Sequence, residues 1–397
     1  MTRAPERDAL PERNTALQLS SMVPPTHFGG AERVIDWLTR ELQRAGLHVR
    51  TAGLRQRGGA PDGTEAHRID NIYWPFDGQS RGVLSRTSWH AIATFMLTAR
   101  RAVESLLDEI RPAVVITHNL RGWGYAPWVA VGARGIPLIQ VVHDYGLICN
   151  PATLWRGAPC ETLCRSCVLR RGVAGRRWPG GQFVAVSQAL LDTYRVHGGN
   201  MVDGALVVHP TSAAKPSEPS APLLPRNNRN GLPDTIGFLG RLTEAKGLET
   251  LLSAMQTTSQ RLLVAGDGEK AYVRSLHRSA SSNVDWLGWV DPGRLFEQID
   301  VLVVPSVWHE PFGLVVVEAA RAQVPVLLAD RPGLVEAARA SAARYLTFSA
   351  SDPSSLAEAL RRPMVDYVAQ DVVVHSADLV QLVLKTVSNG ANAQRPR

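Results

Sequence analysis

The stretch that most constrains the fold runs from residue 301 to residue 322 and reads VLVVPSVWHEPFGLVVVEAARA. Its first four residues are apolar and β-branched or leucine, which is typical of a short buried strand. Two prolines interrupt the pattern, and from Gly313 onward the segment lacks proline and predicts a helix. A strand, a tight loop and a helix form the phosphate-binding unit of doubly wound α/β proteins. We therefore expect an α/β protein in which the backbone N–H groups of Phe312, Gly313 and Leu314 face a phosphate.

Two carboxylates flank this expected phosphate site. Glu310 lies in the loop and Glu318 on the helix, with seven residues between them. A carboxylate repels a phosphate but accepts hydrogen bonds from sugar hydroxyls. The combination predicts a nucleotide sugar as ligand, and the alternative is a nucleotide-binding helix that carries two incidental glutamates.

The length of the chain and its apolar content favour two domains without a membrane span. A chain of 397 residues is long for one hydrophobic core. No apolar run reaches the roughly 18 residues that a membrane helix needs. Residues 1–14 are charged and carry no apolar signal segment, so they predict a disordered leader and a cytoplasmic protein.

The charge of the chain is uneven. Residues 1–208 hold 24 arginines, no lysine and 17 acidic residues, whereas residues 209–397 hold 19 basic and 19 acidic residues. All of the net charge of +7 therefore belongs to the first half. Such a half attracts anionic lipid, nucleic acid or an anionic substrate, and the alternative is a solvated, arginine-rich surface.

A glycine pair enters the first expected helix. Residues 16–21 predict a strand, and helical spacing of apolar residues extends over residues 31–45. Gly29 and Gly30 lie between them, where the absence of side chains lets the backbone approach a ligand closely. Residues 47–49 predict the next strand, residues 72–74 another, and residues 92–110 one long amphipathic helix.

Two further predicted strands each end in a histidine. Residues 113–117 precede His118, and residues 137–142 precede His143 and Asp144. Ligands in open α/β sheets bind beyond the carboxyl ends of the strands. These side chains are therefore candidates for the cleft, and a structural hydrogen-bonding role is the alternative for each.

All four cysteines lie within 19 residues, at positions Cys149, Cys160, Cys164 and Cys167. Four clustered thiols are typical of a tetrahedral structural zinc site. The spacing differs from that of common zinc ribbons, so free thiols and a single disulfide remain alternatives. Beyond the cluster, residues 170–178 contain four arginines and Trp178, and they predict a basic, aromatic loop.

A linker divides the chain, and a cationic loop opens the second half. Residues 210–233 are rich in Pro, Ser and Asn. Residues 235–239 then predict a strand that is followed by the loop carrying Arg241 and Lys246, one of only four lysines in the protein. Arginine and lysine side chains are suited to neutralising phosphate oxygens.

Four motifs in this order resemble one enzyme family. They are GGAERV at residues 29–34, HDY at 143–145, GRLTEAKG at 240–247, and EPFG followed by Glu318 after four residues. Together they are similar to the signature of retaining glycosyltransferases of the GT-B fold, in particular family 4. The resemblance extends over roughly residues 15–375.

The resemblance implies two Rossmann-like domains with the active site in the cleft between them. Residues 15–209 would form the acceptor-binding domain, residues 210–233 the linker, and residues 234–375 the domain that binds the nucleotide sugar. Residues 376–390 would form a helix that crosses back to the first domain. Catalysis would need no metal ion, because the chain contains no Asp-x-Asp motif.

The resemblance also implies roles for the candidate residues. His118 would contact the transferred sugar, Glu310 would orient its hydroxyl groups, and Glu318 would hold the ribose. The diphosphate would be bound by Gly30, Arg241, Lys246, Phe312, Gly313 and Leu314. Gly29, His143 and Asp144 would line the acceptor side of the cleft.

Two positions depart from the family pattern. Gln323 stands where the helix of Glu318 usually ends in glycine, so it must adopt a left-handed conformation or end the helix differently. Pro332-Gly333 replaces a glycine pair near the donor. Rival functions are a nucleotide-sugar epimerase or phosphorolytic enzyme of the same fold, and a non-catalytic nucleotide-sugar binder.

The acceptor is predicted from the charge of the first half. Arg170, Arg171, Arg176, Arg177 and Trp178 suggest contact with an anionic membrane surface. We therefore expect a cytoplasmic enzyme that docks on the inner face of the membrane and glycosylates a lipid-linked or envelope-precursor acceptor. The alternative is a soluble enzyme that uses a small-molecule acceptor, and no nucleic acid is expected as a partner.

Overall fold

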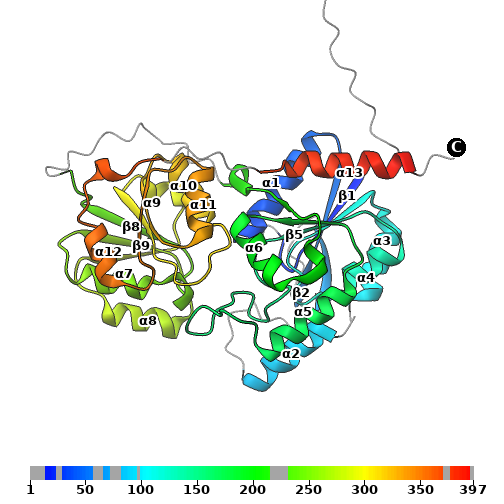
Figure 1. The fold of residues 1–397 in the computed structure, drawn as a ribbon, viewed down its shortest axis with the longest axis horizontal. Coiled ribbons are helices and arrows are strands. Elements are labelled where there is room, and N and C mark those ends of the chain that lie inside the picture. The colour runs from blue at the N-terminus through cyan, green and yellow to red at the C-terminus, as the bar shows by residue number, and fades with distance from the viewer. Residues whose placement is uncertain are drawn as a thin grey trace, which may run out of the picture.

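The computed structural model describes residues 14–23, 29–56, 66–71, 82–95, 99–214, 231–369 and 376–393. Two parallel sheets, each flanked by helices, form two lobes side by side (Figure 1). This arrangement confirms the predicted α/β architecture with two Rossmann-like units.

The first sheet has seven strands in the order β3-β2-β1-β4-β5-β6-β7, and all of its pairings are parallel. Its strands are β1 (Thr15–Leu19), β2 (His48–Gln56), β3 (His67–Asn71), β4 (Val114–Thr117), β5 (Leu138–Val142), β6 (Gln182–Ala185) and β7 (Leu206–Val207).

The second sheet has six strands in the order β10-β9-β8-β11-β12-β13, again all parallel. They are β8 (Thr235–Leu239), β9 (Arg261–Ala265), β10 (Val284–Gly288), β11 (Val301–Val304), β12 (Val326–Ala329) and β13 (Tyr345–Phe348). Every residue of β11 is buried, as expected for a parallel strand covered on both faces.

Helices connect the strands of both sheets. The first unit contains α1 (Gly30–Arg44), α2 (Val83–Phe95), α3 (Arg100–Ile110), α4 (Ala126–Ala133), α5 (Arg165–Arg177) and α6 (Gln188–His197). The second contains α7 (Leu248–Met255), α8 (Lys270–Ser279), α9 (Pro292–Phe296), α10 (Leu314–Arg321), α11 (Pro332–Ala340) and α12 (Pro353–Ala359). The last helix, α13 (Leu379–Ala393), packs on α1 and β4 and so lies beside the first sheet (Figure 1).

Four predictions about single elements were wrong or lie outside the described residues. The long helix expected over residues 92–110 is two helices, α2 and α3. The basic stretch at residues 170–178 is no loop but belongs largely to α5, whose residue Arg170 is buried. The expected strand at residues 72–74 and all but the last residue of the leader expected at residues 1–14 lie outside the described parts, and the observed strand β3 ends at Asn71.

For the helix that carries Glu318, we expected either a left-handed Gln323 or a different helix end, and the left-handed conformation is the one observed. Gln323 has a φ of 57°, in the left-handed region that favours glycine. Among the described residues, no helix is both long enough and apolar enough to cross a membrane.

Candidate active site

The two lobes meet where strands of both sheets reach their carboxyl ends. Tyr145, just beyond β5, donates a hydrogen bond from its hydroxyl to the carbonyl of His309, 3.1 Å away, in the loop after β11. Ser187 at the start of α6 likewise donates to the carbonyl of Pro311. A Cβ atom placed on Gly30 would lie 3.5 Å from the side chain of Leu314, so the glycine loop faces the start of α10. The cleft residues of both domains are thus brought together.

Lys246 and Glu310 form a two-pronged ion pair in this region. The Lys246 ammonium lies 2.9 and 2.7 Å from the two carboxylate oxygens of Glu310. Glu310 also accepts hydrogen bonds from the Trp308 indole at 2.9 Å and the Ser306 hydroxyl at 3.0 Å. Burial raises the pKa of the Glu310 carboxyl, but Lys246 and these hydrogen bonds outweigh burial and leave the pKa below its usual value.

Backbone shape explains why the loop of Lys246 reaches Glu310. Gly247 has a φ of 69°, and a Cβ atom there would come within 1.9 Å of the Pro305 carbonyl oxygen. Only glycine permits this approach, which holds the lysine loop against the loop after β11. The ammonium of Lys246 also lies 5.5 Å from the centre of the Trp308 ring, close enough for a cation–π contact.

The start of α10 has the form expected of an anion site. Gly313, which precedes the helix, has a φ of 100°. Among the described residues, no acceptor is found for the backbone N–H of Phe312 or Gly313. A Cβ atom on Gly333 would lie 2.0 Å from the Glu310 carbonyl oxygen, so α11 packs directly beneath this loop. Donors at a helix start, with Lys246 on the neighbouring loop, suit a negatively charged group.

Glu318 is engaged across the two lobes. Its carboxylate pairs with the guanidinium of Arg33 on α1, and its side chain is only 3% exposed. In this closed arrangement Glu318 has a protein partner where a ribose was expected. Burial lowers the pKa of Arg33.

The glycine loop before α1 is closed by an acid that sequence reasoning did not select. The buried carboxylate of Glu32 accepts a hydrogen bond from the Gly29 N–H at 2.8 Å, in the manner of a capping box. Burial raises the pKa of Glu32, and the charge of Arg241 partly offsets that increase. Burial likewise raises the pKa of Asp144, and the positive charge of Arg241 acts in the opposite direction. Arg241 therefore lies near acids of the opposite domain.

The two strand-end histidines lie side by side. His118 Nδ1 is 2.9 Å from His143 Nε2, and His118 Nε2 is 2.9 Å from the Gln18 amide oxygen. His118 is 1% exposed. The structure thus brings together the two histidines predicted for the cleft, but both ring nitrogens of His118 already have protein partners.

The four cysteines lie in the segment between β5 and the first turn of α5 as reduced thiols. A hydrogen bond between Cys149 and Cys167 lowers the pKa of Cys149 to about 7 and raises that of Cys167. Within the described ranges, no three His, Cys, Asp or Glu side chains are grouped closely enough to hold a metal ion. The Arg156 guanidinium donates a hydrogen bond to the Cys164 sulfur, 3.2 Å away. Zinc binding by the four cysteines stays a prediction.

Sequence reasoning missed several residues of the cleft. Gln18, Trp308 and Glu336 carry no motif that marks them. Glu32 and Arg33 lie within the GGAERV motif but were given no role, although Glu32 follows Gly29 at capping-box spacing. Glu336 on α11 accepts hydrogen bonds from the N–H groups of Gln188 and Ala189, at 2.5 and 2.9 Å. It therefore ties the second domain to the start of α6.

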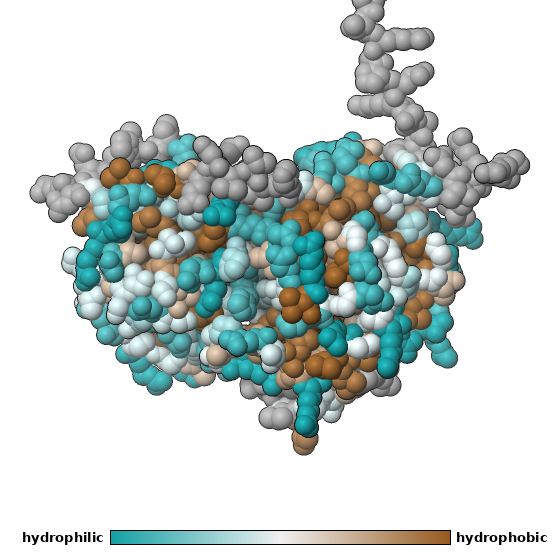
Figure 2. Space-filling view, viewed as in Figure 1, coloured by the Kyte–Doolittle hydropathy of each residue, from teal (hydrophilic) through white to brown (hydrophobic). Residues whose placement is uncertain are grey.

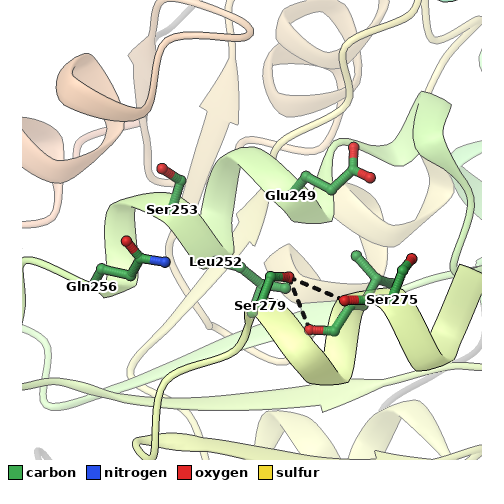
Figure 3. A pocket seen from close by; sticks show the side chains of 7 residues that line it. Glu249, Leu252, Ser253, Gln256, Ser275 and Ser279 are labelled. Atoms are coloured by element: carbon green, nitrogen blue, oxygen red, sulfur yellow. Dashed lines mark hydrogen bonds between the residues drawn. The ribbon is translucent and has the colours of Figure 1, made fainter.

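A groove between α7 and α8 is unsuited to a phosphate ligand. Figure 3 shows hydroxyl, amide and carboxylate groups along it, and Ser279 turns back to bond the carbonyls of its own helix. Its lining contains the acid Glu249 and no cation. The interdomain cleft, which carries Lys246 and Arg241, remains the candidate active site.

Comparison with known families agrees with this geometry. Residues 28–200 match the model described as Glycosyltransferase Family 4, and residues 233–366 match that described as Glycosyl transferases group 1. Together the two models cover about three quarters of the chain.

Comparison with individual proteins extends over most of the molecule. An uncharacterized 42.6 kDa protein in the cps region of Klebsiella pneumoniae is 25% identical over 332 residues, which is 81% of this chain and 86% of that protein. A phosphatidyl-myo-inositol mannosyltransferase of Mycobacterium leprae is 33% identical over 36% of this chain and 39% of its own length. The crystal structure of Anabaena HepE with UDP-glucose superposes with a TM-score of 0.62 at 17% identity, covering 96% and 97% of the two chains. The fold is therefore GT-B.

Proposed function

Because this chain belongs to the group 1, family 4 glycosyltransferases, we propose that it transfers a sugar from a nucleotide-diphosphate donor with retention at the anomeric carbon. The observation that carries the proposal is the meeting of Lys246, Glu310 and the start of α10 at the interdomain cleft. The donor diphosphate would lie at this start, within reach of Lys246 and Arg241. That HepE binds UDP-glucose on the same fold supports a nucleotide-sugar donor.

The charge on the leaving diphosphate would be stabilised by the protein itself. Arg241, Lys246 and the N–H groups of Phe312 and Gly313 supply positive potential where charge develops. We propose that this set makes catalysis independent of a metal ion. Same-face substitution, in which the leaving phosphate receives the acceptor's proton, is the mechanism that the family implies for retention.

A donor panel tests the proposal. Thermal shift with UDP-, GDP-, ADP- and dTDP-sugars should identify one stabilising donor, because a ligand at about 100 times its Kd stabilises by about 2.7 kcal/mol. Lys246→Ala and Arg241→Ala should each lower kcat/KM at least about 100-fold, consistent with the loss of one charge-stabilising group. Lys270→Ala is the matched control, since Lys270 is an exposed lysine on α8. Normal turnover by Lys246→Ala would place the phosphate site elsewhere.

We further propose that the acceptor is lipid-linked and that the first domain docks on an anionic membrane. The docking surface differs from the one expected from sequence, because Arg170 is buried and Trp178 packs on Trp128. The exposed face of α5 instead presents apolar and cationic side chains together, and Leu84 of α2, a helix that contacts α5, is also exposed. Figure 2 shows hydrophobic and hydrophilic residues side by side at this edge. The surface consists of Leu84, Arg165, Val168, Leu169, Arg176 and Arg177.

Vesicle co-sedimentation separates a membrane-linked from a soluble acceptor. Binding should require anionic phosphatidylglycerol vesicles and fall with salt. Replacing Arg176 and Arg177 with Gln should weaken binding by about 1 kcal/mol per charge, whereas Arg274→Gln on α8 should not. Equal partitioning onto neutral phosphatidylcholine vesicles, or none onto anionic ones, would contradict docking and favour a small soluble acceptor.

A further inference from the structure

The histidine at the end of β4 is enclosed, whereas the one at the end of β5 is only partly buried. His118 is 1% exposed and both of its ring nitrogens have partners. His143 is partly exposed, and within the described residues its Nδ1 atom has no hydrogen-bond partner. Tyr145, two residues further on, contacts the other domain, so His143 stands at the cleft. The ring atom able to meet a ligand is therefore on His143.

The order of donors and acceptors behind these histidines is fixed, starting at Gln18. The Gln18 Nε2 atom lies 3.3 Å from the Ile35 carbonyl, which can only accept, so Nε2 must be the donor. The Thr39 hydroxyl donates to the same carbonyl at 2.8 Å and accepts from Gln18 at 2.7 Å. The amide oxygen of Gln18 is consequently turned toward His118.

This orientation determines the tautomer of each ring. Because the Gln18 oxygen only accepts, His118 Nε2 carries the hydrogen. Burial lowers the pKa of His118 well below its usual value and that of His143 to about 3, so each ring is neutral and holds one N–H. His118 Nδ1 must then accept, and the hydrogen between the rings belongs to His143 Nε2.

A second buried glutamine, Gln140, fixes the main chain at His118. The Gln140 amide donates to the His118 carbonyl at 2.8 Å, while its oxygen accepts from Thr117 at 2.6 Å and from the Trp128 indole at 3.0 Å. His118 is thus clamped at its backbone and at both ring nitrogens. Such a clamp orients whatever His118 contacts, which is the ring of His143.

We propose that Gln18 and His118 are positioning residues that hold His143 as its Nε2–H tautomer, so that the bare Nδ1 atom accepts a hydrogen bond from a sugar hydroxyl in the cleft. The inference rests on the proposed glycosyl transfer, but the tautomer does not. His143, in place of His118, then touches the sugar. A neutral acceptor suits an uncharged hydroxyl and leaves the diphosphate to Lys246 and Arg241.

The tautomers are measured first, without any substrate. The full-length protein is labelled with ¹⁵N-histidine, and the signals of His118 and His143 are assigned from His118→Phe and His143→Phe. Both rings should show a bare Nδ1 and a protonated Nε2 at neutral pH. A protonated Nδ1 on His143 would overturn the proposal, whatever the enzyme's activity.

The role in transfer is measured with the donor that the panel identifies. Gln18→Met removes the acceptor for His118 and should give His143 mixed tautomers, with kcat roughly tenfold lower and donor Kd unchanged, as expected for one neutral hydrogen bond. His143→Gln retains an N–H for His118 and an oxygen that accepts, so it should keep more of kcat than His143→Phe. If Gln18→Met fails to fold, Thr39→Val tests the same series of hydrogen bonds. It changes the shape of the side chain less and removes the hydroxyl that accepts from the Gln18 amide.

The outcomes distinguish the contact of His143 with the sugar from the proposed glycosyl transfer itself. Mixed tautomers in Gln18→Met with unchanged kcat, or equal activity of His143→Gln and His143→Phe, would show that His143 does not bind the sugar. Expected tautomers in a protein that transfers no sugar at all would contradict the proposed function, and with it the role of His143.

Discussion

At the scale of single residues, Glu310 keeps its charge in a nearly buried position because several donors surround its two oxygens. Lys246 reaches both oxygens, and Trp308 and Ser306 add hydrogen bonds. The pKa of Glu310 lies below the usual value of 4.5. The stabilisation from this pair is therefore fully present above about pH 4.5 and is lost as the pH falls through the lowered pKa.

Replacement of Glu310 should separate it from Glu318 in kinetics. Glu310→Ala should lower kcat, because Lys246 loses the partner that positions it and the sugar loses an orienting carboxylate. Glu318→Gln should mainly weaken donor binding. Steady-state kinetics with the identified donor checks both, and identical effects would contradict this division of roles.

The free energy of unfolding offers a second check on Glu310. Glu310→Gln should destabilise the protein by about 1–3 kcal/mol at neutral pH, since it weakens a charged hydrogen-bonding group. The difference from the wild type should stay constant from pH 8 to pH 5 and shrink below the usual carboxyl range. A difference that grows on acidification would mean that the pKa of Glu310 is raised in the folded protein and not lowered.

At the scale of elements, α10 ends at a residue that is poorly suited to its conformation. Gln323 is exposed and left-handed, with a φ of 57°. Gln323→Gly should stabilise the protein by about 1 kcal/mol, because glycine adopts this region without strain. Gln323→Ala is the matched control and should bring no gain. Urea unfolding of the three proteins decides, and equal midpoints would mean that the strain is relieved elsewhere.

The cysteine segment between β5 and α5 remains a candidate zinc site. Purified protein should contain about one zinc per chain, and Cys164→Ser should lose both the metal and stability. Elemental analysis and thiol titration measure this directly. A metal-free protein with all four thiols titratable would reject the prediction.

Elements with strong local patterns could be predicted from sequence, and those set by packing could not. The strands β8 and β11 were predicted with the observed bounds. Buried apolar runs between glycines and polar turns mark them clearly. The helix α5 was missed because its arginines and glycines show little amphipathic pattern, and its position depends on burying Arg170 against the carbonyl of Gly146, 2.5 Å from the guanidinium.

The same limit applies to the site. Lys246, Glu310 and Gly313 lie on motifs with local meaning, so their juxtaposition could be anticipated. Arg33 and Glu336 matter only because two domains close on each other, and no local pattern records a contact between residues nearly 300 positions apart. The enclosure of His118 likewise depends on Gln18, 100 residues away in sequence.

At the scale of the whole molecule, ion pairs and hydrogen bonds hold the two lobes in a closed arrangement. Glu318 pairs with Arg33, while Glu336 caps α6 and lies 2.6 Å from His209 Nε2. The His209 ring also stacks on Phe312, with centres 5.6 Å apart. A donor that occupies Glu318 must first displace Arg33.

Opening of the lobes should follow from loss of Glu336. Glu336→Ala removes the bonds to Gln188, Ala189 and His209 at once and should increase the radius of gyration in small-angle scattering. Glu358→Ala on α12 is a suitable control, since Glu358 is exposed within the second domain. An unchanged radius would show that other contacts suffice to keep the cleft closed.

The central claim is transfer of a sugar with retention, and the product's anomeric configuration tests it most directly. With the stabilising donor and a membrane extract as acceptor source, ¹H NMR follows the donor's anomeric signal into product. We predict that the sugar appears in a glycosidic linkage of the donor's own configuration. An inverted linkage would contradict retention, and a free epimer, a sugar phosphate, or an unchanged donor that nevertheless binds would contradict glycosyl transfer itself.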